Sequence, residues 1–131
     1  MKFYKCLNCE KDCVVSHQKT NKYCSFACQI AYQHTQYITE WKQGLQDGKC
    51  GKLQTSRHIK RYILTRQENK CALCNISEWM GKSITLELDH INGHSEDNTE
   101  INLRCVCPNC HSQTDTFRAK NVGNGRKNRK S

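Results

Sequence analysis

The sequence predicts a small α+β protein that zinc ions hold together, and two observations lead to this class. The first is the number of cysteines, 11 in a chain of 131 residues; most of them form two sets of four with the spacing of zinc ligands. The second is the modest share of hydrophobic residues, 36%, which is too small for one large core. We therefore expect small modules in which a metal ion substitutes for core packing and drives folding.

The charge of the chain restricts the class of partner. Its 21 lysines and arginines outnumber its 12 aspartates and glutamates, and the net charge is +9. A basic chain of this kind favours a polyanionic partner, and nucleic acid comes first. The sequence has no transmembrane run, so we expect no membrane partner. Many cysteines without an apolar N-terminal segment predict a reducing, cytoplasmic compartment, in which cysteines bind metal and do not form disulfides.

Residues 1–33 are predicted to form a zinc finger. Four cysteines have the spacing of its ligands: Cys6, Cys9, Cys24 and Cys28. We favour this set because the C-x2-C spacing of its first pair is the commoner one in zinc sites. Cys9 and Cys13 are also a plausible ligand pair, and His17 is a further candidate ligand.

Residues 34–55 are predicted to be a helix followed by a flexible linker. From Gln29 to about Gln46, apolar residues recur at near-helical spacing: Ile30, Tyr37, Ile38, Trp41 and Leu45. Glycines at positions 44, 48 and 51 then interrupt the pattern, and residues 47–55 predict a linker. We expect the modules on either side to move independently, with Cys50 as a free thiol.

Residues 56–120 begin with a second predicted helix. Ser56 is suited to be its N-cap, and the helix should run to about Glu68. Its apolar face should cover a β-hairpin, and it consists of Ile59, Ile63 and Leu64. Basic residues on the rest of the helix could contact phosphate groups: Arg57, Lys60 and Arg61.

The second set of four cysteines lies in this module: Cys71, Cys74, Cys107 and Cys110. They form two C-x2-C pairs with a 32-residue spacer. Four thiolates make a closed tetrahedral zinc site with no position for substrate, so this ion should be structural. Cys105 lies next to a ligand but outside the C-x2-C frame, and we interpret it as a small buried residue.

Between these two pairs, the sequence predicts a hairpin with polar side chains at the end of its first arm. Residues 84–88 alternate between apolar and polar, which is typical of a half-buried strand. Asp89 and His90 follow directly, and consecutive strand residues face opposite ways. They can serve one site only if the strand bends or ends there, which Gly93 permits. Residues 98–103 should return as the second arm.

A helix should follow the second C-x2-C pair. His111 would open it immediately after the ligand Cys110, so the zinc ion fixes the direction of His111 and aims it at Asp89. Thiolates select zinc, whereas a carboxylate with an imidazole and open positions suits a divalent ion that still binds water and phosphate oxygen. The module should therefore combine one structural and one reactive metal site.

Three short motifs, Asp89-His90, Asn102-Leu103 and Cys107-x2-Cys110-His111, together resemble the HNH endonuclease signature in its four-cysteine, zinc-bound form. The similarity extends from about Ser56 to about Lys120. Residues 1–33 resemble the treble-clef-like fingers often joined to phage HNH nucleases. The resemblance implies a treble-clef-like zinc finger, a linker, a C-terminal ββα-metal domain and, at residues 121–131, a basic disordered tail.

The resemblance and the residue chemistry agree on the roles of the site residues. Asp89 and His111 would hold a catalytic divalent ion, Mg2+ or Mn2+ with Ni2+ as a further candidate, beside the two structural Zn2+ ions. His90 would be the general base. Asn102 resembles a group that ties the hairpin and holds His90, although a turn-stabilising asparagine fits the position equally well. Further basic residues are candidate phosphate contacts: Arg104, Arg118 and Lys120.

The expected function is hydrolysis of double-stranded DNA by a metal-dependent HNH endonuclease. The alternative is a non-catalytic, zinc-dependent DNA-binding protein that keeps only the scaffold; the presence of Asp89, His90 and His111 favours the enzyme. Homing, host-DNA degradation, restriction and packaging all fit this chemistry, and so do a monomer and a homodimer.

Overall fold

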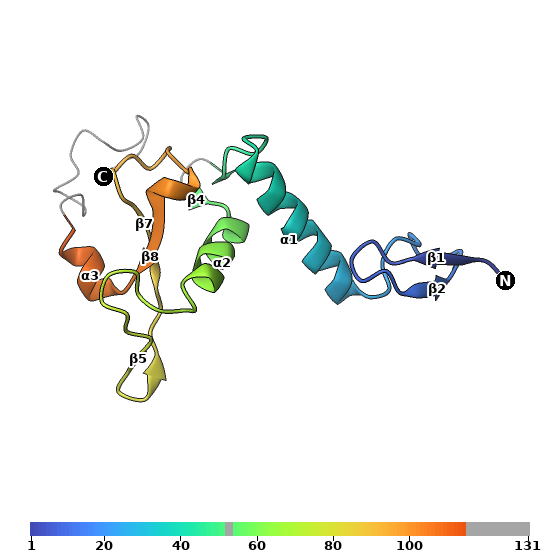
Figure 1. Ribbon diagram of the computed structural model, residues 1–131, viewed down its shortest axis with the longest axis horizontal. Coiled ribbons are helices and arrows are strands. Elements are labelled where there is room, and N and C mark those ends of the chain that lie inside the picture. The colour runs from blue at the N-terminus through green and yellow to red at the C-terminus, as the bar shows by residue number, and fades with distance from the viewer. Residues whose placement is uncertain (52–53, 115–131) are drawn as a thin grey trace.

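The chain forms two units that one long helix, α1 (Phe26–Lys42), connects (Figure 1). This computed structural model describes residues 1–51 and 54–114. Arg118, Lys120 and the tail 121–131, for which we expected DNA contacts and disorder, lie outside the described residues. In the described part of the chain, no helix is long and apolar enough to span a bilayer.

The N-terminal unit is a hairpin and a loop in front of α1. Strand β1 (Phe3–Lys5) pairs antiparallel with β2 (Asp12–Val14). Ser25 caps α1, because its hydroxyl accepts a hydrogen bond from the Cys28 amide at 3.1 Å. Among residues 1–37, all of which the structure describes, Cys6 is the only one that is buried. The unit therefore has thiolates where a larger domain has a hydrophobic core.

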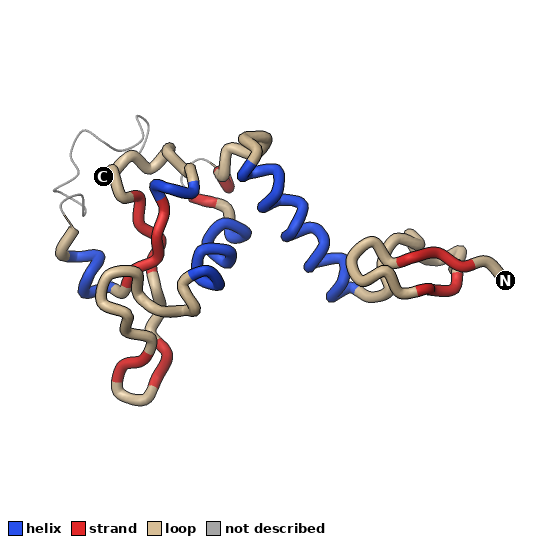
Figure 2. Tube along the Cα trace, in the orientation of Figure 1, coloured by secondary structure: helices blue, strands red, loops and turns tan. Residues whose placement is uncertain are grey.

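Helix α1 is uninterrupted from the N-terminal unit to the C-terminal unit (Figure 2). It ends at Lys42, before the predicted Gln46, because Gly44 takes a left-handed φ of 81°. The amide of Gly44 then binds the Trp41 carbonyl and the amide of Leu45 binds the Glu40 carbonyl, which is the hydrogen-bond pattern of a Schellman cap.

The second half of α1 packs into the C-terminal unit. Ile38 and Trp41 belong to the same buried cluster as Ile59 and Ile63 of α2 (Arg57–Arg66). The Trp41 ring also meets Tyr62 edge to face, with 5.9 Å between the ring centroids. Residues 34–42 are therefore part of the C-terminal core as well as part of the connection between the units.

The segment after α1 differs from the flexible linker that we expected. Strand β3 (Lys49–Cys50) pairs antiparallel with β4 (Gln54–Thr55), and Cys50 is exposed. Gly48 is buried with a φ of 80°, and a Cβ atom there would lie 2.8 Å from Asn98 Cβ and from Ile59 Cδ1. The missing side chain is what lets this segment pack closely, so the glycine indicates close approach here and not flexibility.

The C-terminal unit is built on a two-stranded antiparallel sheet. Strand β7 (Glu87–His90) pairs with β8 (Leu103–Val106), with Asp89 opposite Arg104 and His90 opposite Leu103. Strand β7 begins three residues later than the predicted residue 84 and contains both Asp89 and His90. A short 3-10 helix, η1 (Glu100–Asn102), precedes β8, and α3 (Pro108–Ser112) follows it.

Two helices flank this sheet. Helix α2 packs on β8 and α3 packs on β7. The buried cluster between them contains Ile59, Ile63, Leu103, Cys105 and Val106, together with Cys71 and Cys107. A small hairpin, β5 (Glu78–Trp79) with β6 (Lys82–Ser83), projects from this unit (Figure 1). The whole is a small mixed α/β protein in which thiolate clusters replace much of the core.

Candidate functional site

Four cysteine sulfurs of the N-terminal unit converge on one point, and their residues are Cys6, Cys9, Cys24 and Cys28. The sulfur of Cys24 lies 3.6 Å from that of Cys9 and 3.4 Å from that of Cys28. Four thiolates around Zn2+ lie about 3.8 Å apart, given Zn–S bonds of about 2.3 Å. The donor set therefore fits a structural zinc ion. Cys13 lies outside it, with its thiol 3.5 Å from the Lys11 carbonyl oxygen.

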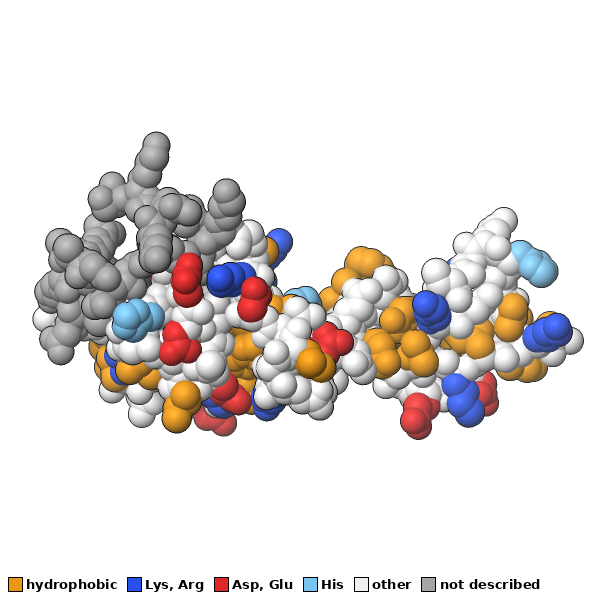
Figure 3. Space-filling model, turned by 90° about the horizontal axis from the view of Figure 1, so that it is seen from above, with side chains coloured by type: hydrophobic (Ala, Val, Ile, Leu, Met, Phe, Trp, Pro, Cys, Tyr) orange, Lys and Arg blue, Asp and Glu red, His pale blue; other side chains and the backbone are white. Residues whose placement is uncertain are grey.

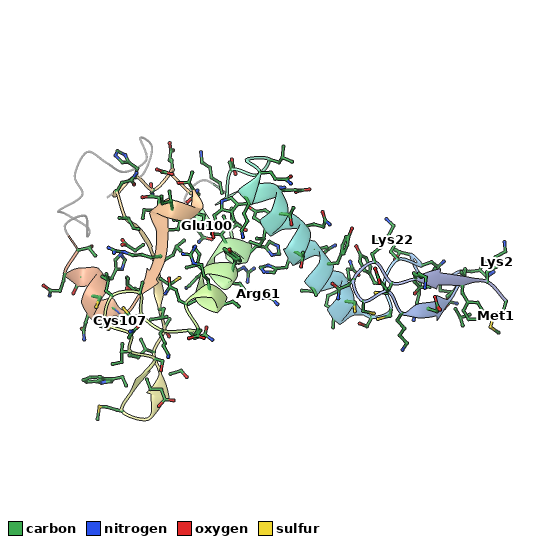
Figure 4. The ribbon with its side chains drawn as sticks, in the orientation of Figure 1. Met1, Lys2, Lys22, Arg61, Glu100 and Cys107 are labelled. Atoms are coloured by element: carbon green, nitrogen blue, oxygen red, sulfur yellow. The ribbon has the colours of Figure 1, made fainter. Side chains whose placement is uncertain are left out.

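The second cluster of four cysteine sulfurs lies at the base of the hairpin, and its residues are Cys71, Cys74, Cys107 and Cys110. The sulfurs of Cys74 and Cys107 are 3.7 Å apart, and Cys107 lies at the junction of β8 and α3 (Figure 4). Its amide donates to the Cys71 sulfur at 3.2 Å. This set also fits Zn2+, and it ties the knuckle after α2 to the start of α3.

Backbone amides favour the thiolate form of one cysteine in each cluster, whereas thiol neighbours raise the pKa of Cys24 and of Cys110 to about 12. Burial by itself would raise the pKa of the Cys71 thiol, but amide donors from Cys74, Cys107 and Leu73 bring that pKa down to about 6. The same balance lowers the pKa of Cys6 to about 6. Cys105 is different, because burial raises its pKa to about 11. Cys105 is fully buried, as the sequence predicted. Its raised pKa keeps the thiol protonated.

Asp89 and His111 face each other across the gap between β7 and α3. Asp89 Oδ1 is 3.7 Å from His111 Nε2, which is too long for a hydrogen bond. Both atoms could therefore bind the same cation, and a carboxylate oxygen with an imidazole nitrogen fits a divalent ion. Asp89 is 4% exposed, and its Oδ2 accepts a hydrogen bond from Arg104 Nε at 2.8 Å.

Glu87 orients His111, a role that we did not predict from the sequence. Its Oε1 lies 3.0 Å from His111 Nδ1, which leaves Nε2 on the side of Asp89. A carboxylate on the second nitrogen of a metal-binding histidine fixes both the tautomer and the ring orientation. Strand alternation could have predicted this contact, because Glu87 and Asp89 are two residues apart and therefore lie on the same face of β7.

His90 has a different neighbour from Asp89, although the two are consecutive. Strand β7 ends at His90, and Gly93 in the following turn has a φ of 78°. The strand thus ends where we expected it to bend or end if Asp89 and His90 serve one site. The Nε2 atom of His90 lies 2.8 Å from Asn98 Oδ1. Asn98 Oδ1 also accepts from the Thr55 hydroxyl at 3.0 Å, and Asn98 Nδ2 donates to the Asp47 carbonyl at 3.5 Å.

These contacts assign the proton on His90. Because Asn98 Nδ2 faces a carbonyl, Asn98 Oδ1 must face the imidazole, and an oxygen can only accept. His90 Nε2 therefore carries the hydrogen, and the lone pair is on Nδ1. Sequence reasoning missed Asn98 entirely.

Asn102 closes the loop between the two strands. Its Oδ1 accepts from the Asn92 amide at 3.0 Å, and its Nδ2 donates to the Asp97 carbonyl at 2.8 Å. We expected Asn102 either to hold His90 or to stabilise the turn; its contacts are those of the second role, and the side chain that binds the imidazole is Asn98. Asn102 instead fixes the ends of the loop that presents Asn98.

The residues that we predicted to contact DNA differ in their surroundings. Arg57 and Arg61 are exposed on α2 and Lys60 is half-buried; Arg61 lies on the side of α2 that faces α1 (Figure 4). Arg104 is paired with Asp89 inside the site. On the face shown in Figure 3, lysines and arginines of the C-terminal unit alternate with acidic side chains.

The fold and site define a zinc-binding α/β protein with a carboxylate and two histidines gathered around the end of one strand. Over 90 residues the chain is 36% identical to the H-N-H endonuclease F-TflIV of Escherichia phage T5, which confirms its resemblance to phage HNH endonucleases. The matched part is 67% of this chain and 40% of that relative, so the chain spans less than half of the relative's length. No protein-family model matches the chain, and no solved structure matches it.

Proposed function

We propose that this chain is a metal-dependent endonuclease that hydrolyses DNA phosphodiester bonds. The observation that carries this proposal is the pair formed by Asp89 Oδ1 on β7 and His111 Nε2 on α3, which lie 3.7 Å apart. Two facing donors of this kind leave most positions of a divalent ion open to water and phosphate oxygen.

The ion held by Asp89 and His111, Mg2+ or Mn2+, would stabilise charge on the scissile phosphate and on the leaving oxygen. Glu87 and Arg104 keep the two donors in place through the contacts at 3.0 Å and 2.8 Å. The guanidinium of Arg104 lies beside the site, where it can also neutralise a phosphate oxygen.

His90 is the general base in this proposal. Its Nε2 hydrogen binds Asn98, so its Nδ1 lone pair takes a proton from the water that attacks phosphorus. The new bond joins the water oxygen to phosphorus, and the bond from phosphorus to the leaving oxygen breaks. Asp89 and His90 are consecutive at the end of β7, so both would act on one phosphate bound at that end of the strand.

The substrate follows from charge and composition. A net charge of +9 favours a polyanion, and the basic residues on α2 and in the C-terminal stretch are candidate contacts to the DNA backbone. The cytoplasm of the host cell is the compartment that keeps the thiolates reduced.

The test is nicking of supercoiled plasmid by purified protein with Mg2+ or Mn2+, beside the His90→Ala variant. We expect wild type to produce nicked or linear DNA and the variant to lose about 100-fold or more in rate. Zinc content and DNA affinity should be nearly unchanged in the variant, because His90 ligates neither zinc ion. A wild type that binds DNA but does not nick it with either metal would support the non-catalytic alternative.

A further inference from the structure

Asn98 is a buried polar residue with four hydrogen-bond contacts: one reaches Trp41 near the end of α1, and two reach the segment between α1 and α2. It is 4% exposed and lies in the loop after β7. Its backbone carbonyl accepts from the Trp41 indole at 2.7 Å, and its side chain binds the Thr55 hydroxyl and the Asp47 carbonyl. The fourth contact is the bond to His90 Nε2 at 2.8 Å.

The pattern of donors and acceptors is specific for an asparagine. The amide oxygen receives two donors and the amide nitrogen donates to a carbonyl, so rotating the amide by half a turn would set its oxygen against the Asp47 carbonyl oxygen. Gly48 lies against Asn98 Cβ so closely that an added Cβ would be 2.8 Å away. The connection therefore fixes the position of Asn98 as well as the direction of its amide.

We propose that Asn98 is the positioning residue of His90, and that through Asn98 the contacts from Trp41, Asp47 and Thr55 set the orientation and tautomer of the base. This inference rests on the proposed function, in which His90 accepts the proton of the attacking water. It makes Trp41 and Thr55 positioning residues too, although neither bonds to His90. The end of α1 and the residues that follow it thus complete the proposed catalytic site.

The physical reason is that an imidazole at the end of a strand can rotate and exchange its proton between two nitrogens. Without the Asn98 oxygen, His90 would spend part of its time with the hydrogen on Nδ1 or with the ring turned away. Misplacement of a catalytic group on the scale of an ångström lowers the rate by up to about 100-fold. Substrate binding would change little, because Asn98 is buried.

The first experiment measures kcat and KM for plasmid nicking by full-length Asn98→Ala, Thr55→Val and Trp41→Phe. We expect kcat to fall at least about tenfold in Asn98→Ala and by a smaller factor in the other two, with KM within about twofold of wild type. Thr65→Val is the matched control, since the Thr65 hydroxyl binds the Arg61 carbonyl of its own helix, and it should keep wild-type kcat.

A double variant separates positioning from general stability. In the His90→Ala background, Asn98→Ala should cause no further loss of rate, because the group through which it acts is gone. A further loss comparable to that in wild type would overturn the proposal. So would an unchanged kcat in Asn98→Ala. If Asn98→Ala loses its zinc or its fold, then Thr55→Val and Trp41→Phe decide, and wild-type kcat in both would refute the coupling.

A second readout does not depend on activity. Nitrogen NMR of the His90 imidazole should show the hydrogen on Nε2 in wild type and a mixture of tautomers in Asn98→Ala. An active His90→Ala enzyme would refute the general base while leaving this spectroscopic result intact. An inactive His90→Ala enzyme with an unaltered tautomer in Asn98→Ala would refute the positioning role alone.

Discussion

The two carboxylate oxygens of Asp89 have different neighbours. Oδ2 receives a charge-assisted hydrogen bond from Arg104 at 2.8 Å, whereas Oδ1 faces His111 at 3.7 Å. A carboxylate that is only 4% exposed needs a paired cation, because an uncompensated buried charge is strongly destabilising. Arg104 therefore stabilises Asp89 in addition to any contact with phosphate, and its removal would disturb the site before DNA binds.

The geometry around His111 predicts that it acts as a ligand and not as a proton carrier. His111→Asn offers a carbonyl oxygen that suits Mg2+, so this variant should retain measurable nicking. His111→Ala offers no donor and should lose most of it. Because imidazole favours metals later in the divalent series, wild type should prefer Mn2+ or Ni2+, and the Asn variant should shift towards Mg2+.

The measurement is the nicking rate of wild type and both His111 variants in each of the three metals, with zinc content as the control for folding. Equal inactivity of the Asn and Ala variants in every metal, with zinc retained, would mean that His111 acts through its proton. The ion would then need a different set of ligands.

Single residues of the site were predictable where the covalent sequence constrains them. Cys110 directly precedes His111 and Asp89 directly precedes His90, and from this spacing we predicted the proximity of His111 to Asp89 that the structure contains. Their roles in catalysis stay predictions. Asn98 was not predictable, because its role arises from Asp47 and Thr55, which approach it only after the chain has folded. Glu87 was accessible in principle through strand alternation.

At the scale of elements, the contact between α1 and α2 contains a pair of histidines. The Nδ1 atoms of His34 and His58 are 2.9 Å apart, and Tyr37 stacks on His58 with 4.9 Å between the ring centroids. Burial lowers the pKa of His34, and the charges of Arg61 and His58 lower it further. At neutral pH this contact therefore holds His34 in its neutral form.

The lowered pKa of His34 predicts loss of stability in mild acid. The unfolded chain binds a proton to His34 near pH ~6.5, whereas the folded chain binds it only at lower pH. Between these values the unfolded state holds more protons, so the His34 contribution is present above pH ~6.5 and is lost as the pH falls. The midpoint of urea unfolding should thus drop more between pH 7.5 and 5.5 in wild type than in His34→Gln.

His17→Gln is the control for this comparison, since His17 is exposed in the N-terminal unit. The thiolate clusters also lose zinc in acid, but their ligands are the same in all three proteins. An identical pH dependence in wild type and His34→Gln would show that the histidine pair has no such role.

The two longer helices were easier to predict than the strands, whereas α3, expected to open at His111, begins at Pro108. Ser56 was recognisable as a cap, and it accepts from the His58 amide at 3.3 Å. The strands β3 to β6 have two residues each, which is too short for a periodic pattern to develop. The glycine-rich segment after α1 was misinterpreted for a related reason: the sequence shows that Gly48 lacks a side chain, but not that Asn98 and Ile59 fill the space.

At the scale of the whole molecule, the two zinc clusters support different amounts of structure. The N-terminal unit has Cys6 as its one buried residue among positions 1–37, so it depends on its metal. In the C-terminal unit, Cys71 and Cys107 belong to the buried cluster that also contains Trp41 and Ile63. Loss of the second zinc should therefore disrupt the core, the site and the end of α1 together.

We accordingly expect two tightly bound zinc ions per chain and different consequences when each is removed. Cys9→Ser should unfold the N-terminal unit, raise KM for DNA and leave kcat nearly unchanged, because Trp41 and the connection remain packed. Cys71→Ser should unfold the C-terminal unit and abolish nicking, since structural zinc supplies about 10 kcal/mol of folding free energy. Cys13→Ser, outside both clusters, should keep both ions and full activity.

Elemental analysis after dialysis, together with nicking kinetics, tests all three variants. If Cys9→Ser loses kcat as completely as Cys71→Ser, the N-terminal zinc supports the catalytic site as well, and the division between the two clusters fails.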